Sequence, residues 1–416
     1  MIPLLKKYLK GDPILWFVFI ALCVVSAVEM YSATSTLAYK AANHTAPMLH
    51  HVGFLALGAL MAFLIHFIPY KYIRILAYLG LIISVVLLIL VLFMGESEND
   101  ATRWLQIFGI RFQPSEIAKI SVVIVTADMI SRIRKEADNE KTYFRNIILI
   151  VGIICLPIFP ENFSTVCLIL AVVLCMMYIG QVSWKRLLTL VGSLAVVAVM
   201  GYFIVKNTPR ENMPEVFDRS YTWIERIDRF LYEEEDPATK YVINDKNRQV
   251  QHGRIAIARG GIFGVFPGNS IQRDYLPQAY ADFIFAIIVE EMGLVGGIFV
   301  ILLYLVLLFR VGRIATKSKT PFTALLVIGL ALTIVLQALM STSVAASLAP
   351  VTGQPLPLIS RGGTSILVTC IYFGIILGVT RQMRDEEEAE KIGEMAVEDA
   401  EDSDDKQLST VGIDDI

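Results

Sequence analysis

Carboxylate, amine and guanidinium side chains interrupt long apolar segments of this sequence at three places. Charged groups are costly in apolar surroundings, so each place is a candidate for chemistry or binding. The first is Phe112-Gln-Pro-Ser-Glu-Ile-Ala-Lys119, where Pro114 suits the first position of a helix. Glu116 and Lys119 are three residues apart and share a helix face, where they can neutralise one another. The pair either fixes the helix orientation or, with Arg103 in the preceding loop, forms the polar floor of a cavity.

The second place combines glycines, polar residues and the carboxylates Asp282 and Glu290, between Gly260 and Gly293. Asp282 stands where the chain re-enters an apolar segment. Partial desolvation there would raise its pKa and make it a better base. The alternative is that Asp282 only caps the following helix, because Asp is a favoured N-cap residue. Glu290 faces either the same cavity or a neighbouring helix, whereas Glu291 is expected to be structural.

The third place is the segment from Pro350 to Ser365, which is dense in proline and glycine. Such a segment is rigid and non-helical, and at membrane depth it must line a cavity or be buried in protein. Ser360, Arg361 and the glycine amides can bind an anion such as a pyrophosphate. The alternative is that the segment only makes turns.

Membrane-spanning helices must hold the residues of these three segments in position. The chain has 416 residues, of which 55% are hydrophobic and 18% charged, whereas soluble domains have about 45–50% apolar and about 25% charged residues. The excess lies in uncharged blocks of about 20 residues, long enough to cross a membrane as helices. This excludes a soluble enzyme, a secreted disulfide scaffold and a disordered chain. We predict an all-α polytopic membrane protein with ten transmembrane helices, at 14–33, 50–69, 75–94, 114–130, 147–159, 164–181, 187–205, 282–309, 321–340 and 364–380.

The distribution of Lys and Arg predicts the orientation. They concentrate in segments 1–13, 71–74, 132–145, 185–186, 310–319 and 381–384, whereas the short loops on the other side hold only Lys40, Arg103, Arg111 and Arg361. Cytoplasmic loops carry the excess of positive charge, so both termini are expected in the cytoplasm. The predicted organisation is a cytoplasmic N-terminus 1–13, helices one to seven in 14–205, a large extracytoplasmic loop 206–281, helices eight to ten in 282–384, and a cytoplasmic tail 385–416.

The large loop and the tail differ in character. Within the loop, residues 221–232 have helical periodicity, so the loop is expected to be ordered and packed on the membrane face. The tail has fourteen acidic residues against Lys391 and Lys406, a net charge of −12. Because the whole chain is −3, residues 1–384 carry +9, which suits anionic headgroups. The tail is expected to be disordered.

The cysteines show no paired spacing and predict neither disulfides nor a metal site: Cys23, Cys155, Cys167, Cys175 and Cys370.

Together these segments resemble the SEDS family, the shape, elongation, division and sporulation proteins of bacteria, over nearly all of residues 14–380. The resemblance rests on three motifs in order: Phe112-Gln-Pro-Ser-Glu116 with Lys119; Leu276-Pro with Asp282-Phe-Ile-Phe285 and Glu290-Glu-x-Gly293; and Leu356-Pro-Leu-Ile-Ser360 with Gly362-Gly363. The sequence departs from the family pattern at four places: Tyr280-Ala281 replaces His-Thr, Asn162 replaces an aspartate, Arg361 replaces a common Tyr, and Ser341 replaces an Asn.

The resemblance implies a peptidoglycan glycosyltransferase that polymerises lipid II at the outer face of the inner membrane. Asp282 would be the general base, taking the proton from the 4-hydroxyl of the acceptor GlcNAc. Arg103, Lys119 and Arg361 would stabilise the departing pyrophosphate. The other substrate-binding candidates are Gln113, Ser115, Glu116, Glu290 and Ser360. A divalent cation, Mg²⁺ or Mn²⁺, is left open, because the outer loops contain no Asp-x-Asp motif.

The resemblance also implies partners: a class B penicillin-binding protein (an FtsI-like transpeptidase) and membrane proteins of the division complex, with no nucleic acid. Gly268-Asn-Ser-Ile-Gln-Arg273 is similar to the division branch of the family. Three alternatives stay open: the elongation branch, a lipid II flippase, and a catalytically silent scaffold. The charged residues gather at the outer face, whereas transporter sites lie near the midplane, which favours the polymerase.

Overall fold

The ten predicted membrane helices are all present. The computed structural model describes residues 10–33, 46–98, 101–107, 110–213, 219–232, 243, 247–276 and 281–411. The helices are α2 (Pro13–Ala33), α4 (Ala46–Ile65), α5 (Tyr70–Met94), α6 (Pro114–Lys135), α7 (Glu140–Ile158), α8 (Phe163–Ile179), α9 (Trp184–Asn207), α12 (Ile284–Lys317), α13 (Pro321–Ala345) and α14 (Thr364–Val411). Within the described residues, eight are long and apolar enough to cross a membrane. The prediction of a polytopic helical membrane protein is confirmed; α8 is shorter, and α6 carries several charges.

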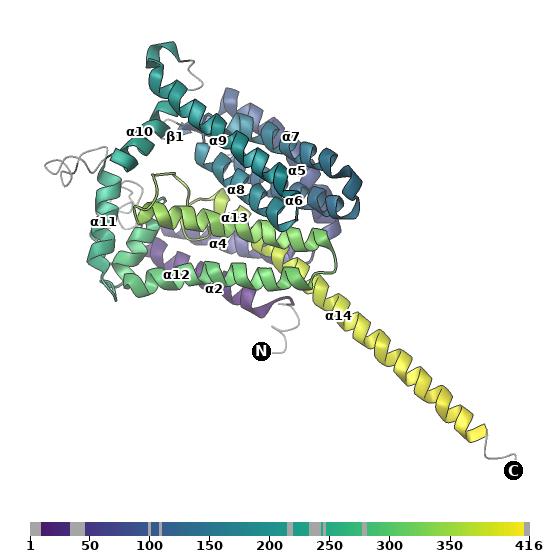
Figure 1. Cartoon of the computed structure of the whole chain (residues 1–416). Coiled ribbons are helices and arrows are strands. Elements are labelled where there is room, and N and C mark those ends of the chain that lie inside the picture. Colours follow the sequence, from purple (N-terminus) through teal and green to yellow (C-terminus); the bar gives the residue numbers. More distant parts are fainter. Residues whose placement is uncertain are drawn as a thin grey trace.

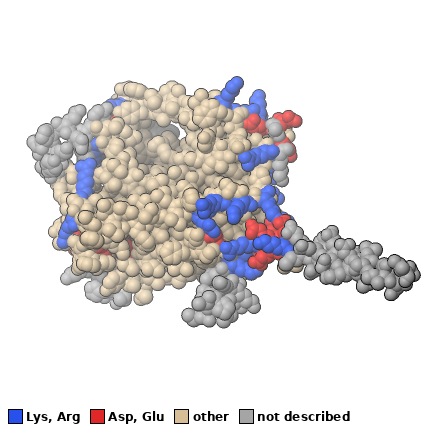
Figure 2. Space-filling model, turned by 60° about the horizontal axis from the view of Figure 1, so that its bottom comes forward, with Lys and Arg blue, Asp and Glu red and all other residues tan. Residues whose placement is uncertain are grey.

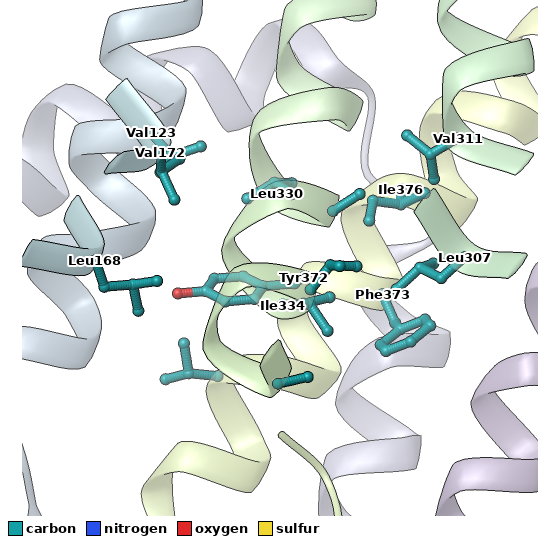
Figure 3. Close-up of a cluster of buried hydrophobic side chains, with 14 of the residues drawn as sticks. Val123, Leu168, Val172, Leu307, Val311, Leu330, Ile334, Tyr372, Phe373 and Ile376 are labelled. Atoms are coloured by element: carbon teal, nitrogen blue, oxygen red, sulfur yellow. The ribbon is translucent and has the colours of Figure 1, made fainter. Parts of the chain in front are cut away.

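The centre of the bundle is formed by α13 and the first part of α14 (Figure 1). Among the described spans, 78% of the apolar part of α13 and 83% of that of α14 are buried, against none for α9. Side chains from several helices meet in this core, including Leu168, Ile334 and Tyr372 (Figure 3). Small residues allow the close helix contacts. A Cβ at Gly374 of α14 would lie 2.7 Å from the carbonyl oxygen of Ala62 in α4.

One end of the bundle, which we call the loop end, carries α10 (Arg219–Tyr232), α11 (Arg248–Gly260) and a small sheet (Figure 1). The helix predicted at 221–232 is therefore confirmed. The sheet is antiparallel with the order β1-β2-β3, from β1 (Glu96–Glu98), β2 (Ala101–Ile107) and β3 (Ile110–Phe112). It was not predicted, and it leads directly into α6. Residues 214–218, 233–242, 244–246 and 277–280 of the predicted large loop lie outside the described part of the chain.

The eighth predicted span is two helical segments separated by a break at Gly293, which has φ 71°. The glycine-rich stretch 260–266 pairs with this break through its backbone. The N–H of Val265 donates to the carbonyl of Glu290 at 3.0 Å, and that of Leu294 donates to the carbonyl of Gly261 at 2.9 Å. A Cβ at Gly264 would lie 2.1 Å from the carbonyl oxygen of Glu291. Glycine is therefore required where the two backbones meet.

The opposite end, which we call the tail end, shows where one prediction differs from the structure. Disorder was predicted for 385–416, but α14 continues to Val411. Two ion pairs tie the start of this extension to the bundle: Lys10 Nζ lies 2.9 Å from Asp385 Oδ1, and Lys319 pairs with Glu390. Glu, Ala and Lys are also good helix formers. Charged side chains gather around the base of the extension, beside a broad uncharged surface (Figure 2).

Candidate active site

The loop between α13 and α14, residues 346–363, contains no helix or strand, as its prolines and glycines predicted. Hydrogen bonds from neighbouring helices hold it in place. Gln337 Nε2 of α13 donates to the carbonyl of Pro355 at 2.9 Å, and Ser164 Oγ of α8 donates to that of Thr352 at 2.9 Å. Gln354 Nε2 donates to Thr165 Oγ1 at 3.0 Å. The loop is therefore a fixed part of the loop end.

Asp282 lies against this loop. Ser360 Oγ donates to the carbonyl of Ala281 at 2.6 Å and accepts from the N–H of Leu356 at 2.8 Å, which joins the loop to the residue before Asp282. A Cβ at Gly353 would lie 3.7 Å from Asp282 Oδ2. The alternative that Asp282 caps α12 is wrong, because the N-cap residue is Phe283 and no side chain caps this helix. The side chain of Asp282 is partly exposed and makes no capping hydrogen bond to α12.

The surroundings of Asp282 suit a base. Burial raises the pKa of its carboxyl above the ordinary value, while the positive charges of Arg103 and Arg226 act in the opposite direction. Burial also lowers the pKa of Arg226, and Asp282 opposes that shift. The carboxylate therefore has two guanidinium groups within electrostatic reach. Arg103, on β2, was predicted for this site.

Arg226 of α10 was not predicted. Its Nη1 donates to the carbonyl of Val351 at 3.1 Å, so α10 is joined to the 346–363 loop. The helix is anchored by Trp223, whose ring centroid lies 5.0 Å from that of Phe163 in a stacked arrangement. Arg219 adds a pair with Glu161, with Nη1 3.1 Å from Oε2. Residues 219, 223 and 226 share one face of a helix, and this spacing is the sequence signal that could have identified Arg226.

The Glu116–Lys119 pair is present and buried. Lys119 Nζ lies 2.8 Å from Glu116 Oε1, and Lys119 and Glu116 are 1% and 6% exposed. Lys119 Nζ also donates to Gln337 Oε1 at 3.1 Å, and Gln337 in turn holds Pro355. The pair is thus linked through α13 to the 346–363 loop. This geometry supports the first of its two predicted alternatives, an ion pair that fixes orientation, and contact with a substrate stays a prediction.

The remaining predicted residues lie at three places. Gln113 and Ser115 lie at the start of α6, where Gln113 Nε2 donates to Ser115 Oγ at 2.9 Å. Glu290 lies elsewhere, paired with Arg259 at 2.9 Å. The charge of Arg361, in the 346–363 loop, acts on His51 of α4. The structure therefore brings Asp282, Arg103 and Ser360 together, links Glu116 and Lys119 to them, and separates Glu290.

Two further sequence expectations concern the site. Asn162, which replaces a family aspartate, caps α8 by accepting from the N–H of Thr165 at 3.2 Å, and it also accepts from Gln354 Nε2 at 3.4 Å. Among the residues that the structure describes, no group of three or more His, Cys, Asp or Glu side chains is arranged to hold a metal ion.

Comparisons with known proteins agree with this architecture. The FtsW, RodA and SpoVE family, described as cell cycle proteins, matches residues 13–385. The chain is 31% identical to the probable peptidoglycan glycosyltransferase FtsW of Bacillus subtilis (strain 168), over 93% of this chain and 95% of that protein. It is 31% identical to the protein of the same name from Coxiella burnetii, over 80% and 85%. It is 28% identical to the peptidoglycan glycosyltransferase MrdB of Escherichia coli (strain K12), over 88% and 93%.

Two solved structures share the fold. One, described as "Structural coordination of polymerization and crosslinking by a peptidoglycan synthase complex", has a TM-score of 0.70 and 23% identity, over 90% of this chain and 98% of that chain. The other, rod shape determining protein RodA of Thermus thermophilus, has a TM-score of 0.61 and 23% identity, over 91% and 99%. The match over residues 13–385 covers the bundle, both ends of it and every residue of the site. The chain belongs to the FtsW, RodA and SpoVE family of cell cycle proteins.

Proposed function

We propose that this protein is a peptidoglycan glycosyltransferase that polymerises lipid II, as the names of its relatives indicate for those proteins. One observation carries the proposal: Asp282 is a partly exposed carboxylate against the 346–363 loop, where burial raises its pKa and the charges of Arg103 and Arg226 oppose that shift. A base beside fixed positive charge suits a reaction in which a hydroxyl loses a proton and a phosphorylated group departs.

In the proposed reaction, Asp282 takes the proton from the 4-hydroxyl of the acceptor GlcNAc. That oxygen attacks the anomeric carbon of the donor MurNAc, and the bond from this carbon to the pyrophosphate oxygen breaks. The α-linked donor yields a β-1,4 bond in one inverting step, and polyprenyl pyrophosphate leaves with its electron pair. Arg103 and Arg226 are the cations near Asp282. The proposal is compatible with a divalent cation, Mg²⁺ or Mn²⁺, that would bind the pyrophosphate of the substrate.

The proposed cellular setting follows from the same features. We propose that the loop end faces the periplasm and both termini face the cytoplasm, and the asymmetry of Lys and Arg supports this orientation. We propose a division role of the FtsW type at the septum, supported by Gly268-Asn-Ser-Ile-Gln-Arg273 and by FtsW-named relatives. The alternative is an elongation role of the RodA type, which the similarity to MrdB supports.

The proposed partners are a class B penicillin-binding protein (FtsI-like) and other membrane proteins of the division complex. One structural relative belongs to a peptidoglycan synthase complex that coordinates polymerization and crosslinking. A polymerase whose product is crosslinked by a second protein would gain from such an association, because the new glycan strand would emerge beside the transpeptidase.

The second candidate function is a lipid II flippase, which membrane helices with buried charges would also suit. The site favours the polymerase, because its charged residues lie at the loop end, where the charges of Arg103 and Arg226 act on Asp282. Substrate sites of transporters lie near the bilayer midplane.

A reconstitution experiment tests the function. The full chain is placed in vesicles that contain lipid II, with and without an FtsI-like class B penicillin-binding protein whose transpeptidase is blocked. We expect glycan polymer on the accessible face, with the largest yield when the partner is present. Movement of lipid II across the bilayer without polymer, in either preparation, would instead support the flippase.

A further inference from the structure

A second group of charged residues lies where α2 packs against α12, just before the break at Gly293. Its members are Glu29 of α2, Glu290 and Glu291 of α12, Arg259 of α11, and Arg273 in the segment that leads to Asp282. The three glutamates are each 0% exposed. The proposed glycosyl transfer uses none of these side chains, so their burial needs a separate explanation.

Two of the three carboxylates have defined partners. Glu290 pairs with Arg259 at 2.9 Å and accepts from the N–H groups of Ile271 at 3.2 Å and Gln272 at 3.3 Å. Glu291 Oε1 accepts from Ser32 Oγ and from the N–H of Ser270 at 3.3 Å. These bonds fix the backbone of segment 270–272 against α12.

Glu29 differs from both. Neither of its oxygens has a hydrogen-bond partner among the described residues, and Glu291 Oε2 also has none. The guanidinium of Arg273 is engaged elsewhere: its Nη1 donates to the carbonyl and the hydroxyl of Ser32, both at 3.0 Å, and lies 3.9 Å from Glu291 Oε1. Ser32, which hydrogen-bonds Glu291 Oε1, stands one helical turn after Glu29 on the face of α2 that packs against α12, so the carboxyl groups of Glu29 and Glu291 are neighbours.

The charges of this group do not balance. Three buried carboxylates face two guanidinium groups, and Arg273 also lies 3.3 Å from the exposed carboxylate of Asp274. A buried, ionised carboxylate without a donor is strongly disfavoured. Two neighbouring carboxylates cannot both ionise in such a place and instead hold one proton between them.

We propose that Glu29 and Glu291 form a proton-binding site in which one proton is shared at neutral pH. The carboxyl O–H of Glu29 donates to Glu291 Oε2, and no other bond changes. This hydrogen bond joins α2 to α12 beside the break and supports the segment 270–273. The ligand is a proton and not a metal ion: the described residues offer no three-ligand cluster, and Arg273 already supplies positive charge.

Other titratable groups near α2 are accounted for. His51 of α4 hydrogen-bonds Ser26 at 2.8 Å, one helical turn from Glu29. The membrane part of α14, residues 364–380, has only Cys370 and Tyr372 as titratable groups. Neither side chain carries a positive charge that could balance the negative charge of a carboxylate. The proposal does not depend on the glycosyltransferase function.

Thermal unfolding of the full chain in nanodiscs between neutral and alkaline pH tests the proposal. The folded state holds a proton that unfolded glutamates have released, so the unfolding equilibrium constant should rise about tenfold per pH unit from this site. Glu29→Gln keeps a neutral donor and needs no proton uptake on folding, so its Tm at neutral pH should be at least that of the wild type, and this contribution to the pH slope should vanish. Glu388→Gln, an exposed control, should keep the wild-type slope.

Infrared spectroscopy of the wild type with carbon-13-labelled glutamate gives a second readout that does not require a variant to fold. A protonated glutamic acid carbonyl band from the wild type at neutral pH is the expected result. The proposal is overturned if that band is missing from the wild type, or if Glu29→Gln keeps the full pH slope. It is also overturned if Na⁺ or Mg²⁺ at fixed ionic strength raises the Tm of the wild type alone, because a metal would then occupy the site.

Discussion

Replacement of Asp282 by Asn is expected to lower the rate of glycan polymerisation by about 10²–10⁴-fold, the usual contribution of a general base. Asn has nearly the same shape but cannot accept the proton from the sugar hydroxyl. Because Asp282 does not cap α12, the substitution removes no helix cap. The measurement is the initial rate of polymer formation from lipid II by the purified chain with its class B penicillin-binding protein.

The control for this variant is Glu225→Gln, which removes an exposed carboxylate of α10 next to Arg226. Its rate should stay within about twofold of the wild type, because exposed charges contribute little. Both variants should have the Tm of the wild type. A folded Asp282→Asn protein that polymerises lipid II normally would show that another group accepts the proton.

Replacement of Lys119 by Ala is expected to destabilise the protein by about 3–5 kcal/mol, because Glu116 would be left as a buried charge without its partner. The ammonium group also holds Gln337, which holds Pro355, so the 346–363 loop should loosen as well. The measurement is thermal unfolding in detergent, followed by the polymerisation rate. Lys185→Ala, which removes an exposed lysine of α9, is the matched control and should change the Tm little.

A double variant, Lys119→Met with Glu116→Gln, distinguishes a positioning role from substrate contact. It removes both buried charges, so most of the stability should return. If the pair positions the loop, activity should return partly along with stability. A variant that is stable but inactive would instead indicate that the charges meet the substrate. Wild-type stability in Lys119→Ala would contradict the ion pair seen in the structure.

Much of this architecture could be predicted because the length of an apolar run is a direct physical requirement of the membrane. All ten helices were placed in this way, and the spacing of Glu116 and Lys119 predicted their ion pair. Asp282 was singled out because a carboxylate at the edge of an apolar segment is costly. These predictions use only local sequence.

Features that depend on contacts between distant segments could not be predicted. The break at Gly293 is a single backbone conformation that apolar periodicity does not register, and it exists because residues 260–266 pair with it. Arg226 reaches the site on a helix that is held by the packing of Trp223 on Phe163 and by the Arg219–Glu161 pair. Glu290 was assigned to the substrate site, but its partner Arg259 lies 31 residues away, on α11.

The pH dependence of kcat/KM for polymerisation, measured for the wild type and for Arg226→Gln, tests the assignment of Asp282 most directly. The ionised carboxylate is the active form, so activity should fall as pH drops through its raised pKa. The positive charge of Arg226 lowers that pKa, so its removal should move this acidic limb to higher pH, by about one unit. An acidic limb that stays in place in Arg226→Gln, or that persists in Asp282→Asn, would contradict the assignment.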